Sequence, residues 1–164
     1  LRHLVERKVR SAVVAGINDA AAVANCFEAG AGKKLRLSIG ATIEKRHGPP
    51  LEAEVEVVRL IADRRQVVGR IDGVEVILAA GPTAFTDPSQ FETCGIDPLS
   101  RKLVVVKEGY LYPGLTRIAP RYMMLLTPGA GDMRLERLTY ARRRRPVFPF
   151  EPDTAFDPES AAPS

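Results

Sequence analysis

The most informative candidates for chemistry follow an apolar run in the C-terminal half of the chain. Lys107 comes directly after Leu103–Val106, and Glu108, Gly109 and Tyr110 follow it. Ligands of α/β proteins gather at the carboxyl ends of strands. A lysine there can hold an anion, and a glycine lets the backbone approach a ligand closely. A lysine at a strand end can equally extend into solvent, so both interpretations stay open. Lys107, Gly109 and Tyr110 are the candidate ligand-binding residues.

The remaining reactive side chains are scattered along the sequence. His3 and His47 have no partner at ligand spacing, and Cys26 and Cys94 belong to no CxxC pair. A zinc site needs about three or four converging ligands. No serine lies in a Gly-x-Ser-x-Gly setting, which a hydrolase nucleophile elbow would require. We therefore predict no catalytic residue, no metal ligand and no self-sufficient active site in this chain.

A glycine-rich segment, Gly30–Lys33, looks at first like a phosphate-binding loop. Such a loop needs Gly-x4-Gly-Lys-Ser/Thr between a strand and a helix. Phe27 occupies the upstream glycine position and Lys34 replaces the Ser/Thr. The segment also follows a predicted helix, so no helix N-terminus points at a phosphate. We interpret it as a helix C-cap.

Two charged segments have an ordinary explanation beside a functional one. Glu52, Glu54 and Glu56 alternate along a predicted strand and indicate a hydrated sheet face. The run Arg142–Arg145 could attract an anion or a nucleic acid. Four acidic residues follow it in the tail, however, and no aromatic side chain is interleaved for base stacking. Together with a net charge of only +4, this predicts no nucleic-acid partner.

Composition places the chain among ordinary globular domains. It has 164 residues, of which 45% are hydrophobic and 27% charged. No apolar run reaches the roughly 18 residues of a membrane helix, and no signal peptide opens the chain, so no membrane partner is expected. Two unpaired cysteines fit the reducing cytoplasm, which is the predicted location. Leu1–Glu6 has the pattern of a helix from within a longer protein, so we expect a domain of a larger protein. The sequence leaves open whether the chain forms a homo-oligomer.

The periodicities predict an α/β fold with a mixed sheet, an antiparallel meander in the middle and a C-terminal strand–helix–strand unit. Asp72-Gly73 marks a two-residue hairpin. The strand at 103–106 is apolar throughout, so we expect it to be central and covered on both faces. Helices are expected near 1–9, 20–29, 87–92 and 112–119, and strands near 11–17, 34–42, 51–62, 66–71, 74–80, 102–107 and 122–126.

The domain organisation follows from a change in composition near residue 145. Residues 1–145 are expected to form a single α/β domain, and residues 146–164 a Pro-rich extended arm followed by an acidic tail. Pro146 and Pro149 restrict the backbone, while Val147 and Phe148 are apolar enough to pack back onto the domain. The last residues contain little that could bury surface.

Several segments, in order along the chain, resemble the C-terminal domain of the microcystinase C (MlrC)-like family of zinc metallopeptidases. The motifs are Ile17–Val23, Ala29–Gly32, Gly48–Leu51, Ala84–Pro88, Gly95–Pro98, Val104–Lys107, Thr127–Gly129 and Arg145–Glu151. Each motif is short, and their common order over residues 10–151 makes the resemblance specific.

This resemblance implies a hydrolase considerably longer than the present chain. A larger N-terminal domain of the same polypeptide would supply the zinc ligands and the catalytic water. The present domain would complete the cleft wall and position a peptide or amide substrate, without being an enzyme by itself. No cofactor is expected in this chain. The alternative is a non-catalytic module that binds an anionic metabolite or a partner protein.

Two departures from the family pattern affect these expectations. Asn18-Asp19-Ala20 lacks the proline of the family motif. Many members follow the lysine with Ser and a His-Phe pair, whereas Glu108–Pro113 stands here. If this loop contacts substrate, its specificity differs from theirs, and a cyclic peptide toxin should not be assumed as the substrate.

Overall fold

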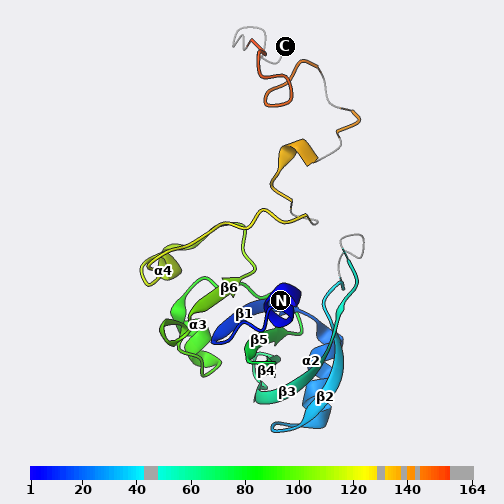
Figure 1. Ribbon diagram of the computed structural model, residues 1–164, viewed down its shortest axis with the longest axis vertical. Coiled ribbons are helices and arrows are strands. Elements are labelled where there is room, and N and C mark those ends of the chain that lie inside the picture. The colour runs from blue at the N-terminus through cyan, green and yellow to red at the C-terminus, as the bar shows by residue number, and fades with distance from the viewer. Residues whose placement is uncertain (43–47, 129–131, 138–139, 143–144, 156–164) are drawn as a thin grey trace. The chain divides into compact units, whose positions relative to one another are not determined.

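The computed structural model describes residues 1–42, 48–128, 132–137, 140–142 and 145–155. His47 lies outside these residues. The chain forms two compact units, Leu1–Leu125 and Leu126–Ser164, and the first contains the whole sheet (Figure 1). The domain boundary expected near residue 145 stays a prediction.

A six-stranded mixed sheet forms the centre of the first unit, in the order β2-β3-β4-β5-β1-β6. Strands β2 to β5 are antiparallel neighbours, whereas β1 runs parallel to both β5 and β6. The predicted mixed α/β sheet and its antiparallel meander are therefore confirmed. The strands are β1 (Ala12–Asn18), β2 (Lys34–Ile39), β3 (Leu51–Ile61), β4 (Gln66–Ile71), β5 (Val74–Ala79) and β6 (Leu103–Val106).

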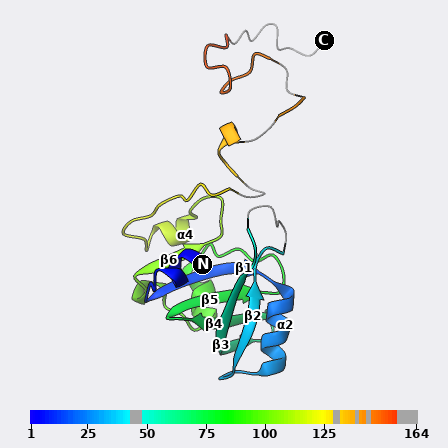
Figure 2. The ribbon, with the colours of Figure 1, turned by 45° about the vertical axis from the view of Figure 1, so that its right-hand side comes forward.

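Helical segments cover both faces of this sheet (Figures 1 and 2). On one face, α1 and α2 pack over apolar residues that include Val14, Val55 and Val76. On the other face, α3 and the segment containing α4 pack over Val13 and Ile77. The alternation of side chains along β1 and β5 thus supplies both layers of the core. The helical segments are α1 (Arg2–Glu6), α2 (Ala20–Ala29), α3 (Pro88–Thr93), η1 (Pro98–Ser100), α4 (Pro113–Thr116) and η2 (Leu135–Arg137).

Local sequence signals explain how α2 begins and ends. The Asp19 carboxylate accepts hydrogen bonds from the backbone N–H of Ala22 at 3.0 Å and of Gly40 at 2.9 Å. It therefore caps the helix and also fixes the chain after β2. At the other end, the N–H of Gly30, with φ of 88°, donates to the carbonyl of Cys26. The interpretation of the glycine-rich segment as a C-cap is confirmed.

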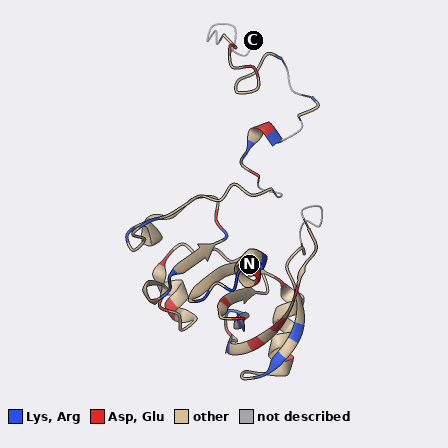
Figure 3. Cartoon of the chain, in the orientation of Figure 1, with Lys and Arg blue, Asp and Glu red and all other residues tan. Residues whose placement is uncertain are grey.

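The hydrated face expected on β3 is present. Glu52 and Glu54 are exposed, and Glu54 and Glu56 stand opposite Arg36 and Lys34 of β2. Figure 3 shows these acidic and basic positions side by side on the two strands. Opposite charges across a strand pair stabilise the register weakly.

Two expectations about the C-terminal strands are wrong. Tyr122–Leu126 is not a strand, so the strand–helix–strand unit lacks its second strand. β6 is an edge strand that pairs only with β1, not a central one. Its apolar residues nevertheless face both core layers, since Val104 and Val106 pack on one face and Val105 on the other. An apolar run predicts that both faces of a strand are covered, but it does not predict how many strands lie beside it.

In the second unit, the expected extended arm is partly a turn. The backbone N–H groups of Phe150 and Glu151 both donate to the carbonyl of Val147, and the Glu151 carboxylate accepts from the Val147 N–H at 2.9 Å. Proline fixes one dihedral angle, which suits a turn as well as an extended chain.

Among the residues described, no helix is long and apolar enough to cross a bilayer.

Candidate functional site

The carboxyl ends of the three parallel strands, β5, β1 and β6, lie side by side, and this end of the sheet is the edge described below. β1 lies between β5 and β6, so the segments that follow these two strands lie on either side of it. Gly16, near the end of β1, has φ of 84° and coincides with an irregularity in the register. A Cβ atom there would lie 3.2 Å from the Thr83 carbonyl oxygen and 3.8 Å from the Lys107 Cβ. Glycine therefore lets both neighbouring loops approach β1 closely.

Lys107 leaves β6 at this edge with its side chain exposed. Within the described part of the chain, no carboxylate lies at ion-pair distance from it. The other two candidates, Gly109 and Tyr110, are exposed as well. The rings of Tyr110 and Tyr112 lie 4.7 Å apart between centroids, and the hydrogen bond with Tyr110 raises the pKa of Tyr112. This edge thus presents an ammonium group with no ion-pair partner among the described residues, and the Tyr110 and Tyr112 rings follow it in the same loop.

Glu108 has a role that the sequence did not reveal. Its Oε1 accepts a hydrogen bond from the backbone N–H of Phe85 at 2.9 Å. This bond joins the loop after β6 to the loop after β5, although the two residues are 23 positions apart. No local spacing signals such a contact, since it depends on β1 being inserted between the two strands.

The start of α4 joins the same two loops at a second point. A Cβ atom at Gly114 would lie 2.8 Å from the Thr86 carbonyl oxygen and 2.5 Å from an Asp87 carboxylate oxygen. The next residue, Leu115, is buried in the core under this edge together with Phe85. Only glycine permits this approach, so the loops that carry Lys107 and Asp87 are fixed relative to each other.

The loop after β5 is itself well ordered by capping. The Asp87 side chain accepts from the N–H of Ser89 at 3.0 Å, and the Gln90 side chain accepts from the N–H of Asp87 at 2.9 Å. These reciprocal bonds form a capping box at the start of α3. The bonds from Ser89 are the main reason that the pKa of Asp87 is lowered, and Arg117 contributes less.

A shallow hollow of about 570 Å³ lies beside this edge. Arg64 and Arg65, in the turn between β3 and β4, line it together with Gly81 and Thr83 from the loop after β5. Asp63 lines it as well, with Oδ2 4.0 Å from Nε of Arg64. The N–H of Ala80 donates to the carbonyl of Arg65 at 3.1 Å, which joins the turn to the end of β5. No local sequence signal marks these two arginines, because the meander must fold before the turn reaches this edge.

The other reactive residues lie apart from this edge and from one another. His3 is exposed, and its Nδ1 lies 3.4 Å from Oε2 of Glu6. Cys26 and Cys94 are buried in the core layers on opposite faces of the sheet, and burial raises the pKa of both thiols. They are therefore poor nucleophiles at neutral pH.

A zinc ion does not fit the donors that the described residues present. Among the described residues, no three or more histidine, cysteine, aspartate or glutamate side chains come close enough to hold a metal ion. Zinc needs about three protein ligands even in a catalytic site. The exposed ammonium group of Lys107 is chemically suited to pair with an anion or to orient a polar group.

Comparisons with known proteins agree with this architecture. A family model described as the MlrC C-terminus matches residues 1–142. Microcystinase C from Sphingomonas sp. is 23% identical over 92% of this chain, which corresponds to 32% of that protein. A crystal structure named "Putative metallopeptidase" from Mesorhizobium sp. BNC1 has the same fold, with a TM-score of 0.72, 22% identity, and coverage of 91% of this chain and 33% of that one.

These matches place the six-stranded sheet and its connections within a known group of proteins. The chain spans about a third of the length of both relatives. Since the family model covers most of its residues, including the entire sheet and the loop that carries Lys107, the chain belongs to the MlrC C-terminal domain family.

Proposed function

We propose that this chain is the substrate-side domain of a metallopeptidase or amide hydrolase. A metal-binding domain outside this chain would carry the reaction, and the carboxyl edge of the parallel strands would form one wall of the cleft. The observation that carries this proposal is the exposed ammonium group of Lys107 at that edge, which has no ion-pair partner among the described residues. Family membership and the naming of one relative as a metallopeptidase support it.

In this proposal, Lys107 pairs with a carboxylate of the substrate or with the oxyanion that develops at the attacked carbonyl. Gly109 gives the substrate backbone access, and Tyr110 contributes an aromatic wall or a hydroxyl group. Glu108 and Gly114 do not contact substrate; they hold the loop in place through Phe85 and Thr86. A zinc ion would belong to the other domain, because this chain lacks a suitable set of donors among its described residues.

The test is the substitution Lys107→Met in the polypeptide that the complete reading frame encodes. A charge-assisted hydrogen bond contributes about 1.5–3 kcal/mol. The rate or affinity for hydrolysis of a mixed peptide library should fall by about ten-fold to a hundred-fold, at about 1.4 kcal/mol per decade. The melting temperature should not change, because the side chain is exposed.

Lys102 provides a matched control for this test. It is also exposed and precedes β6, at the opposite end of the same strand. Lys102→Met should leave the kinetics at wild-type values. Kinetics of Lys107→Met within about two-fold of wild type, at an unchanged melting temperature, would show that Lys107 is an ordinary strand-end lysine.

A second function is favoured by the arginine-lined hollow beside the same edge. The chain would then be a non-catalytic module that binds an anionic metabolite or a partner protein. Binding of small dicarboxylates or phosphates by the chain alone, weakened by substitution of Arg64 and Arg65, would favour this module. A reading frame that encodes no metal-binding domain would favour it as well.

We also propose a cytoplasmic location. Both cysteines are unpaired and buried, which suits a reducing compartment. Cell fractionation with an antibody against the chain would test this location directly.

A further inference from the structure

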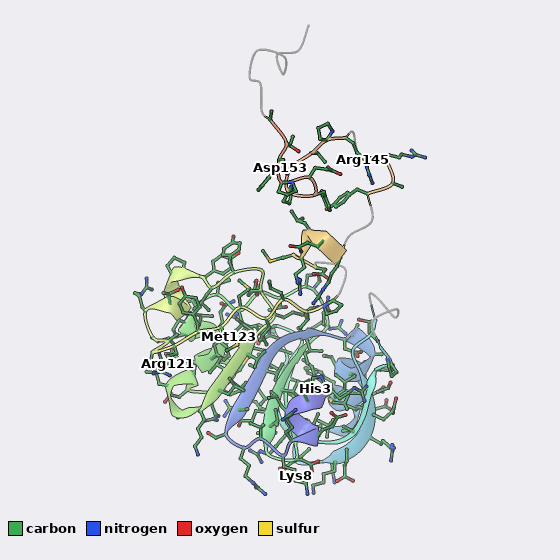
Figure 4. All side chains as sticks on the ribbon, turned by 45° about the horizontal axis from the view of Figure 1, so that its top comes forward. His3, Lys8, Arg121, Met123, Arg145 and Asp153 are labelled. Carbon is green, nitrogen blue, oxygen red and sulfur yellow. The ribbon has the colours of Figure 1, made fainter. Side chains whose placement is uncertain are left out.

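The last residues of the first unit expose an unusual number of apolar side chains. The exposed fractions are 69% for Tyr122, 81% for Met123, 44% for Met124 and 61% for Leu125. These four consecutive residues, named here the Tyr122–Leu125 segment, were expected to form a strand and do not. Figure 4 labels Met123 within this segment. Single exposed apolar residues are common, whereas a contiguous apolar patch usually marks an interface.

The backbone of this segment also lacks hydrogen-bond partners within the described part of the chain. Among the described residues, no hydrogen bond involves a backbone group of Tyr122–Leu125. A stretch with apolar side chains and with backbone N–H and C=O groups that no described residue bonds has the properties of an unpaired strand. Such a stretch readily adds to the edge of another sheet. Side chains and backbone therefore point independently to the same kind of contact.

The comparisons indicate what covers this segment. Over nine tenths of this chain matches each relative, yet the matched part is only about a third of the relative's length. The relatives thus carry a further two thirds of chain with no counterpart here. We propose that the Tyr122–Leu125 segment docks, as an added strand, on the domain formed by that additional chain. This inference rests on the proposed function only in requiring that such a domain exists.

The flanking charges define the expected partner surface. Arg121 immediately precedes the segment and is exposed, whereas Arg117 Nη2 lies 4.0 Å from the Asp87 carboxylate. An apolar groove or sheet edge with acidic side chains at one end would therefore fit best. The segment lies after α4, so docking here would bring the additional domain to the part of the chain that follows the Lys107 loop.

The experiment compares amide hydrogen exchange in the polypeptide encoded by the complete reading frame with exchange in this chain alone. We expect amides of Tyr122–Leu125 to exchange at least about ten-fold more slowly in the longer polypeptide. The double substitution Met123→Ser and Leu125→Ser should remove this protection in the longer polypeptide. In the chain alone, the same substitutions should leave the melting temperature unchanged, because both side chains are largely exposed.

Leu99 supplies the matched control, since its side chain is 68% exposed in η1, ahead of β6. Leu99→Ser should leave the protection of Tyr122–Leu125 intact. Equal exchange in the two polypeptides would overturn the inference, as would a reading frame that encodes no further domain.

Two other occupants would also overturn the inference, and each has its own signature. A second copy of the chain would appear as a concentration-dependent dimer of the chain alone, abolished by the double substitution. The chain's own residues 126–164 would give protection in the chain alone that disappears on truncation. The proposed function is tested separately, because Lys107→Met should not alter the exchange of Tyr122–Leu125. Slow exchange combined with a silent Lys107→Met would refute the function and leave the docking segment standing.

Discussion

The two ends of the parallel strands are held together by different interactions. At the amino ends, Arg101 Nε lies 2.6 Å from Glu75 Oε2, and Arg101 Nη2 lies 3.2 Å from Glu75 Oε1. The side chains are only 22% and 13% exposed, and this hydrogen bonding raises the pKa of Arg101. At the carboxyl ends, apolar packing under the loops holds the strands together, while the ammonium group of Lys107 is exposed to water.

This contrast separates structural charges from charges that are available to a ligand. A partly buried arginine with a bidentate carboxylate partner has little capacity left to bind anything else. An exposed lysine without a partner keeps its full capacity, provided that its loop is fixed by other contacts. Glu108, Phe85 and Gly114 provide such contacts at the carboxyl ends. Substitutions of Phe85, Arg101 and Glu108 should each remove one of the interactions that hold these ends. Substitution of Asp87 should measure what a charge contributes at the carboxyl ends.

The largest effect should come from removing the apolar support of the carboxyl ends. Phe85 is 1% exposed, and its ring contacts that of Phe91 edge to face, with the centroids 5.0 Å apart. Phe85→Ala should lower the free energy of unfolding by about 3–5 kcal/mol, because it leaves a cavity in the core. Urea denaturation of the chain would measure this loss. Leu99→Ala, at an exposed site, should be nearly neutral, and a loss below about 1 kcal/mol for Phe85→Ala would contradict the assignment.

An intermediate effect is expected at the amino ends. Arg101→Met removes the closer partner of the partly buried Glu75 carboxylate and leaves it with Arg70, whose Nη2 lies 4.0 Å from Oε1. This loss should cost about 1–2 kcal/mol in unfolding free energy. Lys34→Met is the matched control, since the ion pair of Lys34 with Glu54 spans 3.9 Å between largely exposed side chains. That control should change stability by no more than about 0.5 kcal/mol. Equal effects of the two substitutions would mean that the amino ends are not held by this pair.

A smaller effect is expected from the bond between the two carboxyl-end loops. Glu108→Ala removes the acceptor of the Phe85 N–H and should cost about 1 kcal/mol in unfolding free energy. Glu108→Gln keeps an oxygen in the same position and should recover most of this loss. Thermal unfolding of both variants would test the assignment, which fails if the alanine and glutamine variants are equally stable.

The sequence predicted those parts of the fold that depend on local patterns. Alternation located the strands of the meander, Asp72-Gly73 located its hairpin, and Asp19 marked the start of α2. Each of these signals lies within a few residues of the element that it specifies. The mixed sheet was therefore predictable before its strand order was known.

Several features that the sequence did not predict depend on strand order. β6 was expected to be central because apolar residues fill it, yet only the order β5-β1-β6 shows that it is an edge. The bond from Phe85 to Glu108 and the position of Arg64 beside Thr83 have the same origin. For the candidate site, the chemistry of Lys107 was apparent from sequence, whereas the contacts that fix its loop were not.

The smallest effect concerns the pH dependence of the capping box at the carboxyl ends. Hydrogen bonds from Ser89 lower the pKa of Asp87 below its ordinary value of 3.8, so the folded state favours the carboxylate. This contribution is present above the ordinary pKa and is lost as the pH falls through the lowered value of the folded state. Asp87→Asn can still cap the helix but cannot ionise. Its melting temperature should therefore lie slightly below that of the wild type near neutral pH, and the difference should disappear on acidification.

Ser89→Ala removes the hydroxyl donor at 2.8 Å and should shrink the same pH-dependent difference. A gap between wild type and Asp87→Asn that is constant from neutral to acidic pH would show that the Asp87 charge does not stabilise this end of the sheet.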